Sequence, residues 1–274
     1  MLKKKYIGTA LACALALGAW SGSALSTPVN VNGVQWDTSD SFYLTVDSFN
    51  LRETQVGAVN DVLTGYGQIG SIDGNNNFCA GCDLTFTFTY TVQSINGNQV
   101  VFNAGSYQFY TQAAGTYKSD MPTSVGLGGT PWVTMAGHTS KNATFTDDVG
   151  QLFATISGTV ADPTVGSGGL GLLDATAGPA SSFLQFNNVS DGMGGFADLN
   201  LNSSFLTKPA KGCTSISPDP TNKCHYPIGG TGELTASTTP TTVPEPGTIG
   251  MLGLGLGFLG LLIRRRRKET DEVS

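Results

Sequence analysis

The sequence has few charged residues, few histidines and no motif of a common catalytic class. Only 12% of its 274 residues are charged, and it has two histidines. The serine-nucleophile turn Gly-x-Ser-x-Gly, the zinc motif His-Glu-x-x-His, the phosphate-binding loop and the dinucleotide fingerprint are all absent. We therefore predict no catalytic residue, no bound metal and no cofactor.

Positive charge is nearly absent from the centre of the chain. Residues 25–242 hold six Lys and Arg against sixteen Asp and Glu, a net charge of −10. The other eight Lys and Arg lie in two short terminal segments. A nucleic-acid surface needs clustered cations to neutralise phosphates, so we expect no nucleic-acid partner.

The N-terminus has the three parts of a secretory signal. Three lysines at residues 3–5 precede an apolar run at residues 6–19, and small residues follow. This order predicts a signal peptide at residues 1–26, with cleavage after Ala24 or Ser26. The secretion translocon and signal peptidase are then the first partners of the chain.

The C-terminus combines a rigid polar motif, an uncharged apolar span and a basic stop. The motif is Val243-Pro244-Glu245-Pro246, and residues 247–263 carry no charge. As a helix, this span would measure roughly 25 Å against about 30 Å of hydrocarbon core, so we predict a short C-terminal transmembrane helix. The stop consists of Arg264, Arg265, Arg266, Arg267 and Lys268. By the positive-inside rule, the stop and the polar tail at residues 269–274 lie in the cytoplasm.

These three parts together resemble the PEP-CTERM sorting signal of Gram-negative envelope proteins, over residues 243–268. The resemblance implies that exosortase, a membrane-embedded processing enzyme, recognises Pro244, Glu245 and Pro246 and processes the chain nearby. It also implies an inner-membrane-anchored precursor, whose body is then released to the cell surface or into exopolysaccharide.

Four cysteines remain once the signal peptide is removed, namely Cys79, Cys82, Cys213 and Cys224. An even number in an oxidising compartment predicts disulfides. Proximity in sequence favours Cys79–Cys82 and Cys213–Cys224, although two other pairings are open. A redox Cys-x-x-Cys belongs at a helix N-terminus, whereas this one precedes a predicted strand, so we interpret it as a structural staple.

Residues 84–92 carry the clearest secondary-structure signal. Leu, Phe, Phe, Tyr and Val alternate there with four threonines, the pattern of a strand with one buried face and one solvated face. Asn96-Gly97 predicts a type I′ turn, with residues 99–102 returning as the hairpin partner.

Weaker strand patterns recur about every ten residues, without a sustained helical period. They cover residues 41–47, 66–72, 107–110, 132–136, 152–159, 182–186 and 198–205; residues 170–177 fit either a helical turn or a strand. This spacing predicts an all-β antiparallel sandwich or jelly roll over residues 27–234. The Thr, Ser and Pro content of residues 235–242 predicts a stalk leading to the membrane.

Possible chemistry rests on a few scattered residues. His138 could join a Ser–His–Asp triad, although hydrogen bonding at the surface is the simpler interpretation for both His138 and His225. A glycoside-hydrolysing carboxylate pair is also conceivable among the sixteen acids. The segment at residues 73–77, Asp-Gly-Asn-Asn-Asn, could ligate Ca²⁺, but we favour a turn.

Two further groups of residues could face a sugar or ice. Thr85, Thr87, Thr89 and Thr91 form a row of hydroxyls that a solvated strand face explains equally well. Trp36 and Trp132 could stack on sugars, but a place in the core is favoured.

The sequence predicts a secreted cell-surface or extracellular-matrix protein, with a structural or adhesive role in exopolysaccharide or biofilm. The alternative is an extracellular carbohydrate-binding module or hydrolase. A cleft with two carboxylates about 5–10 Å apart would favour the hydrolase, and an exposed Trp on a concave sheet would favour sugar binding. A filled sandwich without a polar cleft would favour the matrix role.

Sorting makes a direct prediction for the two ends of the mature chain. We expect mass spectrometry to find a start near Leu25 or Thr27 and an end near Pro244–Pro246, in protein recovered outside the membrane fraction. A membrane-bound chain that retains residues 247–268 would instead show a permanent anchor.

Overall fold

Antiparallel pairing joins nine strands into one sheet in the computed structural model, which describes residues 28–38, 41–142, 144–145 and 149–236. In their order across the sheet, the strands are β10 (Leu152–Thr155), β13 (Ser167–Ala177), β16 (Leu199–Thr207), β17 (Ile228–Ala236), β3 (Phe42–Glu53), β4 (Val62–Ile72), β5 (Cys82–Asn96), β6 (Gln99–Ala113) and β7 (Thr130–His138). The prediction of an all-β antiparallel fold is confirmed.

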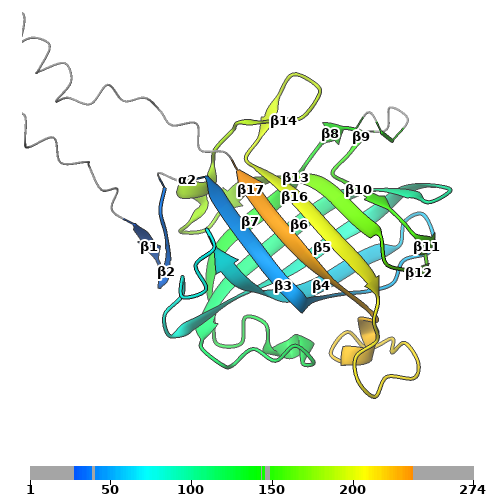
Figure 1. Ribbon diagram of the computed structural model, residues 1–274, viewed down its shortest axis with the longest axis horizontal. Helices are drawn as coiled ribbons and strands as arrows, with labels where there is room; N and C mark the ends of the chain where they lie inside the picture. Colours follow the sequence, from blue (N-terminus) through cyan, green and yellow to red (C-terminus); the bar gives the residue numbers. More distant parts are fainter. Residues whose placement is uncertain (1–27, 39–40, 143, 146–148, 237–274) are drawn as a thin grey trace, which may run out of the picture. The chain divides into compact units, whose positions relative to one another are not determined.

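The sheet closes on itself through a second set of pairings. Strand β13 pairs with β7 as well as β16, and β10 pairs with both β13 and β6. Figure 1 shows β3, β17, β16 and β13 side by side in one wall, with β4, β5 and β6 crossing behind them. The two walls face each other as in the predicted sandwich. They belong to one continuous sheet, however, because these extra pairings join the two edges that an open sheet would leave free.

Short elements surround this sheet. Four small hairpins pair β1 (Val29–Val31) with β2 (Val34–Trp36), β8 (Ser140–Lys141) with β9 (Val149–Gly150), β11 (Gly158–Thr159) with β12 (Asp162–Pro163), and β14 (Val189–Ser190) with β15 (Phe196–Ala197). Among the residues that the structure describes, the helical elements are α2 (Ser181–Leu184) and the 3-10 turns η2 (Pro122–Ser124) and η3 (Lys223–His225).

The alternation predicted for residues 84–92 is present in β5. Its apolar side chains are buried, and the threonines are half-buried on the other face, except Thr85, which is fully buried. Thr85 donates a hydrogen bond to Gln112 Oε1 at 2.8 Å, beneath the loop that joins β6 to β7. A solvated threonine row is therefore wrong at this end of the strand.

The hairpin after β5 differs in turn type from the prediction. Asn96 pairs with Gln99, so Gly97 and Asn98 are the two turn residues, and of these only Gly97 has a positive φ, 61°. This is the arrangement of a type II′ turn, with glycine first, rather than the predicted type I′.

Other strand predictions need smaller corrections. Residues 181–184 form a helical turn where a strand was predicted over 182–186, because Gly178 (φ 98°) turns the chain and Leu184 enters the core. Residues 170–177 belong to β13, and β10 ends at Thr155, before the left-handed Gly158. Strand β17 runs to Ala236, so the first two residues of the predicted stalk are paired with the sheet.

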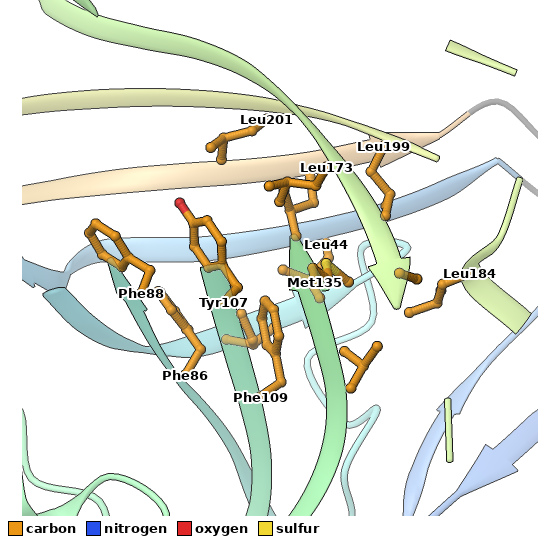
Figure 2. Close-up of a cluster of buried hydrophobic side chains, with 14 of the residues drawn as sticks. Leu44, Phe86, Phe88, Tyr107, Phe109, Met135, Leu173, Leu184, Leu199 and Leu201 are labelled. Atoms are coloured by element: carbon orange, nitrogen blue, oxygen red, sulfur yellow. The ribbon is translucent and has the colours of Figure 1, made fainter. Parts of the chain in front are cut away.

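Aromatic and aliphatic side chains from the two walls meet in one core. Figure 2 shows Phe86, Phe88, Tyr107 and Phe109 of β5 and β6 among leucines that include Leu201 of the opposite wall. Phe88 and Tyr107 stack with ring centroids 5.2 Å apart. This close contact between rings is worth about 0.5–1.5 kcal/mol beyond the burial of area.

Both disulfides join residues that are close in sequence. Cys79 is bonded to Cys82, and Cys213 to Cys224, the two pairings that proximity favours. Cys82 begins β5, and Cys224 lies in η3. The Cys-x-x-Cys is thus placed at the entry to a strand, and the second disulfide ties the loop between β16 and β17.

We expect the close contact of Tyr90 with the backbone of β6 to make Gly105 intolerant of a side chain. A Cβ at Gly105 would lie 2.2 Å from Tyr90 Cε1, whereas one at Gly57 would have its nearest neighbour at 4.0 Å. Gly105→Ala should lower the free energy of unfolding by about 1–3 kcal/mol. The matched control, Gly57→Ala, should change it by less than about 0.5 kcal/mol in the same urea titration. Equal stabilities of the two variants would contradict this packing.

Candidate functional site

The outward side of β3, β17 and β16 is a continuous polar surface. Along these strands, inward side chains such as Leu44, Leu234 and Leu201 are buried in the core, so the residues between them point outward. We call the outward set the outer polar face; it comprises Tyr43, Thr45, Asn200, Asn202, Ser204, Thr231, Glu233 and Thr235. It lies on the wall that is in front in Figure 1.

The strand register arranges this face in rows. Thr235 lies between Tyr43 and Asn200 on the neighbouring strands, and the next row places Glu233 between Thr45 and Asn202. Side chains directly opposite one another are about 4.5–5.5 Å apart at Cβ, so each row can act as one unit. The face thus presents hydroxyl, amide and carboxylate groups at a regular spacing.

A shallow groove of about 230 Å³ is hollowed into this face. Its lining consists of Tyr43, Thr45, Asn202, Ser203, Ser204, Thr231, Gly232 and Glu233. Gly232 contributes no side chain, which leaves room between its neighbours. Tyr43 is 42% exposed, and its ring offers a flat apolar surface beside the polar groups.

Hydrogen bonds hold the β3 side of the groove in place. The hydroxyl groups of Thr45 and Ser71 are bonded to each other across β3 and β4. The backbone N–H of Tyr43 donates to Asp73 Oδ1 at 2.8 Å, and the N–H of Asp73 donates to the Tyr43 carbonyl. The ring of Tyr43 therefore projects from a fixed backbone.

A second polar cluster holds His138 between two carboxylates. His138 ends β7, and its Nδ1 lies 2.7 Å from Asp174 Oδ2 on the neighbouring strand β13. Its Nε2 lies 3.5 Å from Asp191 Oδ2, in the loop after β14. Asp191 Oδ1 also accepts backbone hydrogen bonds from Met193 and Gly195, at 2.7 and 2.9 Å.

The carboxylates favour the charged form of His138. Partial burial lowers the pKa of the imidazole, but the hydrogen bonds and negative charges of Asp174 and Asp191 outweigh that effect and raise it above 6.5. For Asp191, the backbone N–H of Met193 lowers the pKa, burial opposes this, and the N–H of Gly195 and the nearby His138 lower it further. We call His138, Asp174 and Asp191 the clamp, because their contacts link β7, β13 and the β14–β15 hairpin.

This clamp leaves no ring nitrogen of His138 free for a serine. A nucleophilic triad needs one nitrogen on a carboxylate and the other on the hydroxyl that attacks. Here both nitrogens face carboxylates. The geometry therefore does not support the triad hypothesis for His138.

The other residues singled out from sequence have structural surroundings. Trp36 and Trp132 are 4% and 0% exposed, and the Trp132 indole donates to the Val31 carbonyl, so neither can stack on a sugar. His225 lies in η3, with Nδ1 2.7 Å from the Ser217 carbonyl.

Residues 73–77, for which Ca²⁺ binding was the alternative to a turn, form a turn. Asp73 and Gly74 have positive φ, and the Asn75 side chain accepts from the Asn77 N–H at 2.8 Å. In the part of the chain that the structure describes, no three His, Cys, Asp or Glu side chains group in a way that could hold a metal ion.

The outer polar face was missed in the sequence analysis. The pattern around Phe42 and Leu44 places Tyr43 on the outer side of a strand, but the partners of that strand come from residues 200–204 and 231–235. No local signal gives that register.

The predicted signal peptide at residues 1–26 and the sorting residues lie outside the described residues, as does the predicted helix at 247–263. Within the described ranges, no helix is both long and apolar enough to cross a membrane. No curated protein sequence and no solved structure matches the chain significantly.

The family model of the PEP-CTERM protein-sorting motif matches residues 242–267. The chain therefore carries a PEP-CTERM sorting motif at its C-terminal end. The motif implies exosortase as its processing partner and export toward the cell envelope and surface.

Removing either carboxylate of the clamp should lower the pKa of His138. A raised folded-state pKa means that charged His138 stabilises the fold below about pH 6.5, and that this stabilisation is lost as the pH rises through the folded-state value. We expect Asp174→Asn and Asp191→Asn each to lower the pKa of His138 in an NMR titration. Each variant should also lose less stability than the unchanged protein as the pH rises.

Asp120→Asn is the control, because Asp120 is exposed and pairs with Lys223 instead. Equal His138 titration curves in all four proteins would show that the clamp does not form in solution.

Proposed function

We propose that the exported body is a non-catalytic surface or matrix protein that adheres to polysaccharide through its outer polar face. The observation that carries this proposal is the exposed ring of Tyr43 beside a groove of hydroxyl and amide groups. The sorting motif supports it, because the motif directs the body toward the surface, where polysaccharide is found.

The chemistry of the face suits a sugar chain. A pyranose ring has apolar C–H faces and a rim of hydroxyls, so it can pack on an aromatic ring while its hydroxyls bond to neighbouring polar groups. Tyr43 supplies the ring, and Thr45, Asn202 and Ser204 supply donors and acceptors at the spacing of the strands. An extended polymer can contact several rows at once, so weak contacts add up.

The charge of the body favours an uncharged polysaccharide. Residues 25–242 carry a net charge of −10, and Glu233 lies in the groove itself. A polymer rich in carboxylates or sulfates would be repelled, and the face has no Lys or Arg to offset the repulsion. Neutral chains avoid this cost.

The hydrolase alternative requires two carboxyl groups on opposite sides of a bound sugar, with one of them protonated. Asp174 and Asp191 both contact a single imidazole, and the pKa of Asp191 is lowered, which is opposite to what a general acid needs. This observation favours the adhesive role over hydrolysis.

Affinity electrophoresis of the purified protein, in native gels that contain dissolved polysaccharide, tests the adhesive role. We expect a neutral glucan to retard the protein and an anionic alginate to have no effect. Tyr43→Ala should weaken retardation by the glucan roughly tenfold, equivalent to about 1.4 kcal/mol.

Phe196→Ala is the matched control, because Phe196 is also an exposed aromatic residue, 56% exposed, but lies in the β14–β15 hairpin. It should bind like the unchanged protein. If both variants bind equally, the outer polar face is not the contact, and release of reducing sugar from the glucan would favour the hydrolase.

A further inference from the structure

A cavity lies between the two walls of the closed sheet. Its volume is about 70 Å³, counted as the room for the centre of a water-sized sphere. Since one water needs roughly 10–15 Å³ by this measure, the cavity has room for about five waters or a small organic molecule. Most of its lining is apolar and comes from both walls, including Phe88, Phe102, Leu152, Leu201 and Ile228.

One carboxyl group is buried in this apolar lining. Glu53 is the last residue of β3 and lies between Gly65 of β4 and Ile228 of β17. The alternation that directs Leu51 inward also directs Glu53 inward, and it is 93% buried, with 7% of its surface exposed. Gly65, which lies opposite Glu53, has no side chain, and the ring of Phe88 occupies the space beside it. A Cβ at Gly65 would lie only 2.3 Å from that ring.

Glu53 has no protein partner that accounts for its burial. Burial alone raises the pKa of this carboxyl to about 8, and no hydrogen bond or charge in the described part of the chain stabilises its ionised form. Leaving a polar group in an apolar site without a hydrogen bond costs about 1–3 kcal/mol. Native proteins seldom carry that cost without a use for the group.

We propose that this cavity binds a small uncharged apolar molecule that carries one hydrogen-bond acceptor, such as a ketone, and that the Glu53 carboxyl donates to that acceptor. This inference goes beyond surface adhesion, because the cavity and the outer polar face lie on opposite sides of the same strands.

The state of Glu53 selects this ligand class. At neutral pH its carboxyl group is mostly protonated and therefore offers an O–H donor. A ligand ammonium group would have to lose its water on entering the cavity, a cost that a buried ion pair often fails to recover. A ligand carboxylate would meet the same cost without a cation to balance it. A neutral acceptor satisfies the donor without bringing in a charge.

One other titratable group faces the site. Tyr107 of β6 lines the cavity, and burial raises the pKa of its hydroxyl, helped by Tyr90 and Glu53. Glu233 of β17 borders the cavity, but its side chain belongs to the outer polar face, because the neighbouring Leu234 is the one that points inward. Tyr107 therefore stays neutral through the range in which Glu53 titrates, and loss of the Glu53 proton is what ends donation to the ligand.

The test compares cyclohexanone with methylenecyclohexane, which has nearly the same shape but no acceptor oxygen. Binding to the protein, purified from the cells that produce it, is followed by NMR shifts of the core methyl groups. At pH 6.5 we expect the ketone to bind at least tenfold more tightly. The preference should disappear above about pH 9, as Glu53 ionises.

Two variants assign the preference to Glu53. Glu53→Gln keeps a donor that does not titrate, so the ketone preference should persist and become independent of pH. Glu53→Leu removes the donor and the unpaired polar group, so it should fold well and bind both molecules equally.

Three results would overturn the proposal. They are no shift of cavity methyls at millimolar ketone, an unchanged ketone preference in Glu53→Leu, and tighter binding of cyclohexylamine than of cyclohexanone. None of these results depends on polysaccharide binding, so this inference and the proposed function can fail separately.

Discussion

The closure of the sheet, through the pairing of β13 with β7 and of β10 with β6, is the constraint on which the rest of the structure depends. Without it, the nine strands would form an open sheet with two free edges, and the aromatic side chains of β5 and β6 would face water instead of the leucines of β13 and β16. Closure gives every strand an inner and an outer side. The core, the cavity beside Glu53 and the outer polar face all follow from that division.

The division of chemistry between the two sides is unusually sharp. The outer polar face carries hydroxyl and amide groups with a single carboxylate, that of Glu233, and the inner side is almost wholly apolar. Glu53 is an exception on the inner side and Tyr43 on the outer side. Both side chains point where strand alternation directs them, but Glu53 is a polar residue on the buried side and Tyr43 is an aromatic residue on the solvent side. Residue types that do not suit their side of a sheet are expected at binding sites.

Local patterns in the sequence predicted most strands, because alternation depends only on neighbouring residues. The strand over residues 84–92 and the two local disulfides are examples. Closure and the groove could not be predicted, because the register of β3 against β17 is set by packing across the whole fold. Similarly, the sequence indicates only that Glu53 is a polar residue at the end of a strand. Its burial becomes evident only from the apolar residues that the fold brings around it.

The order of the strands also bears on how the protein reaches its place. Strand β3 is completed on one side by β4, which follows it in the chain, but on the other side by β17, the last strand of the described body. In a chain that is synthesised from the N-terminus, that gap stays open until residues 228–236 have been made, just ahead of the sorting motif at 242–267. Such long-range pairing is slow to form. The last pairing of the closed sheet thus waits for the segment that comes just before the sorting motif.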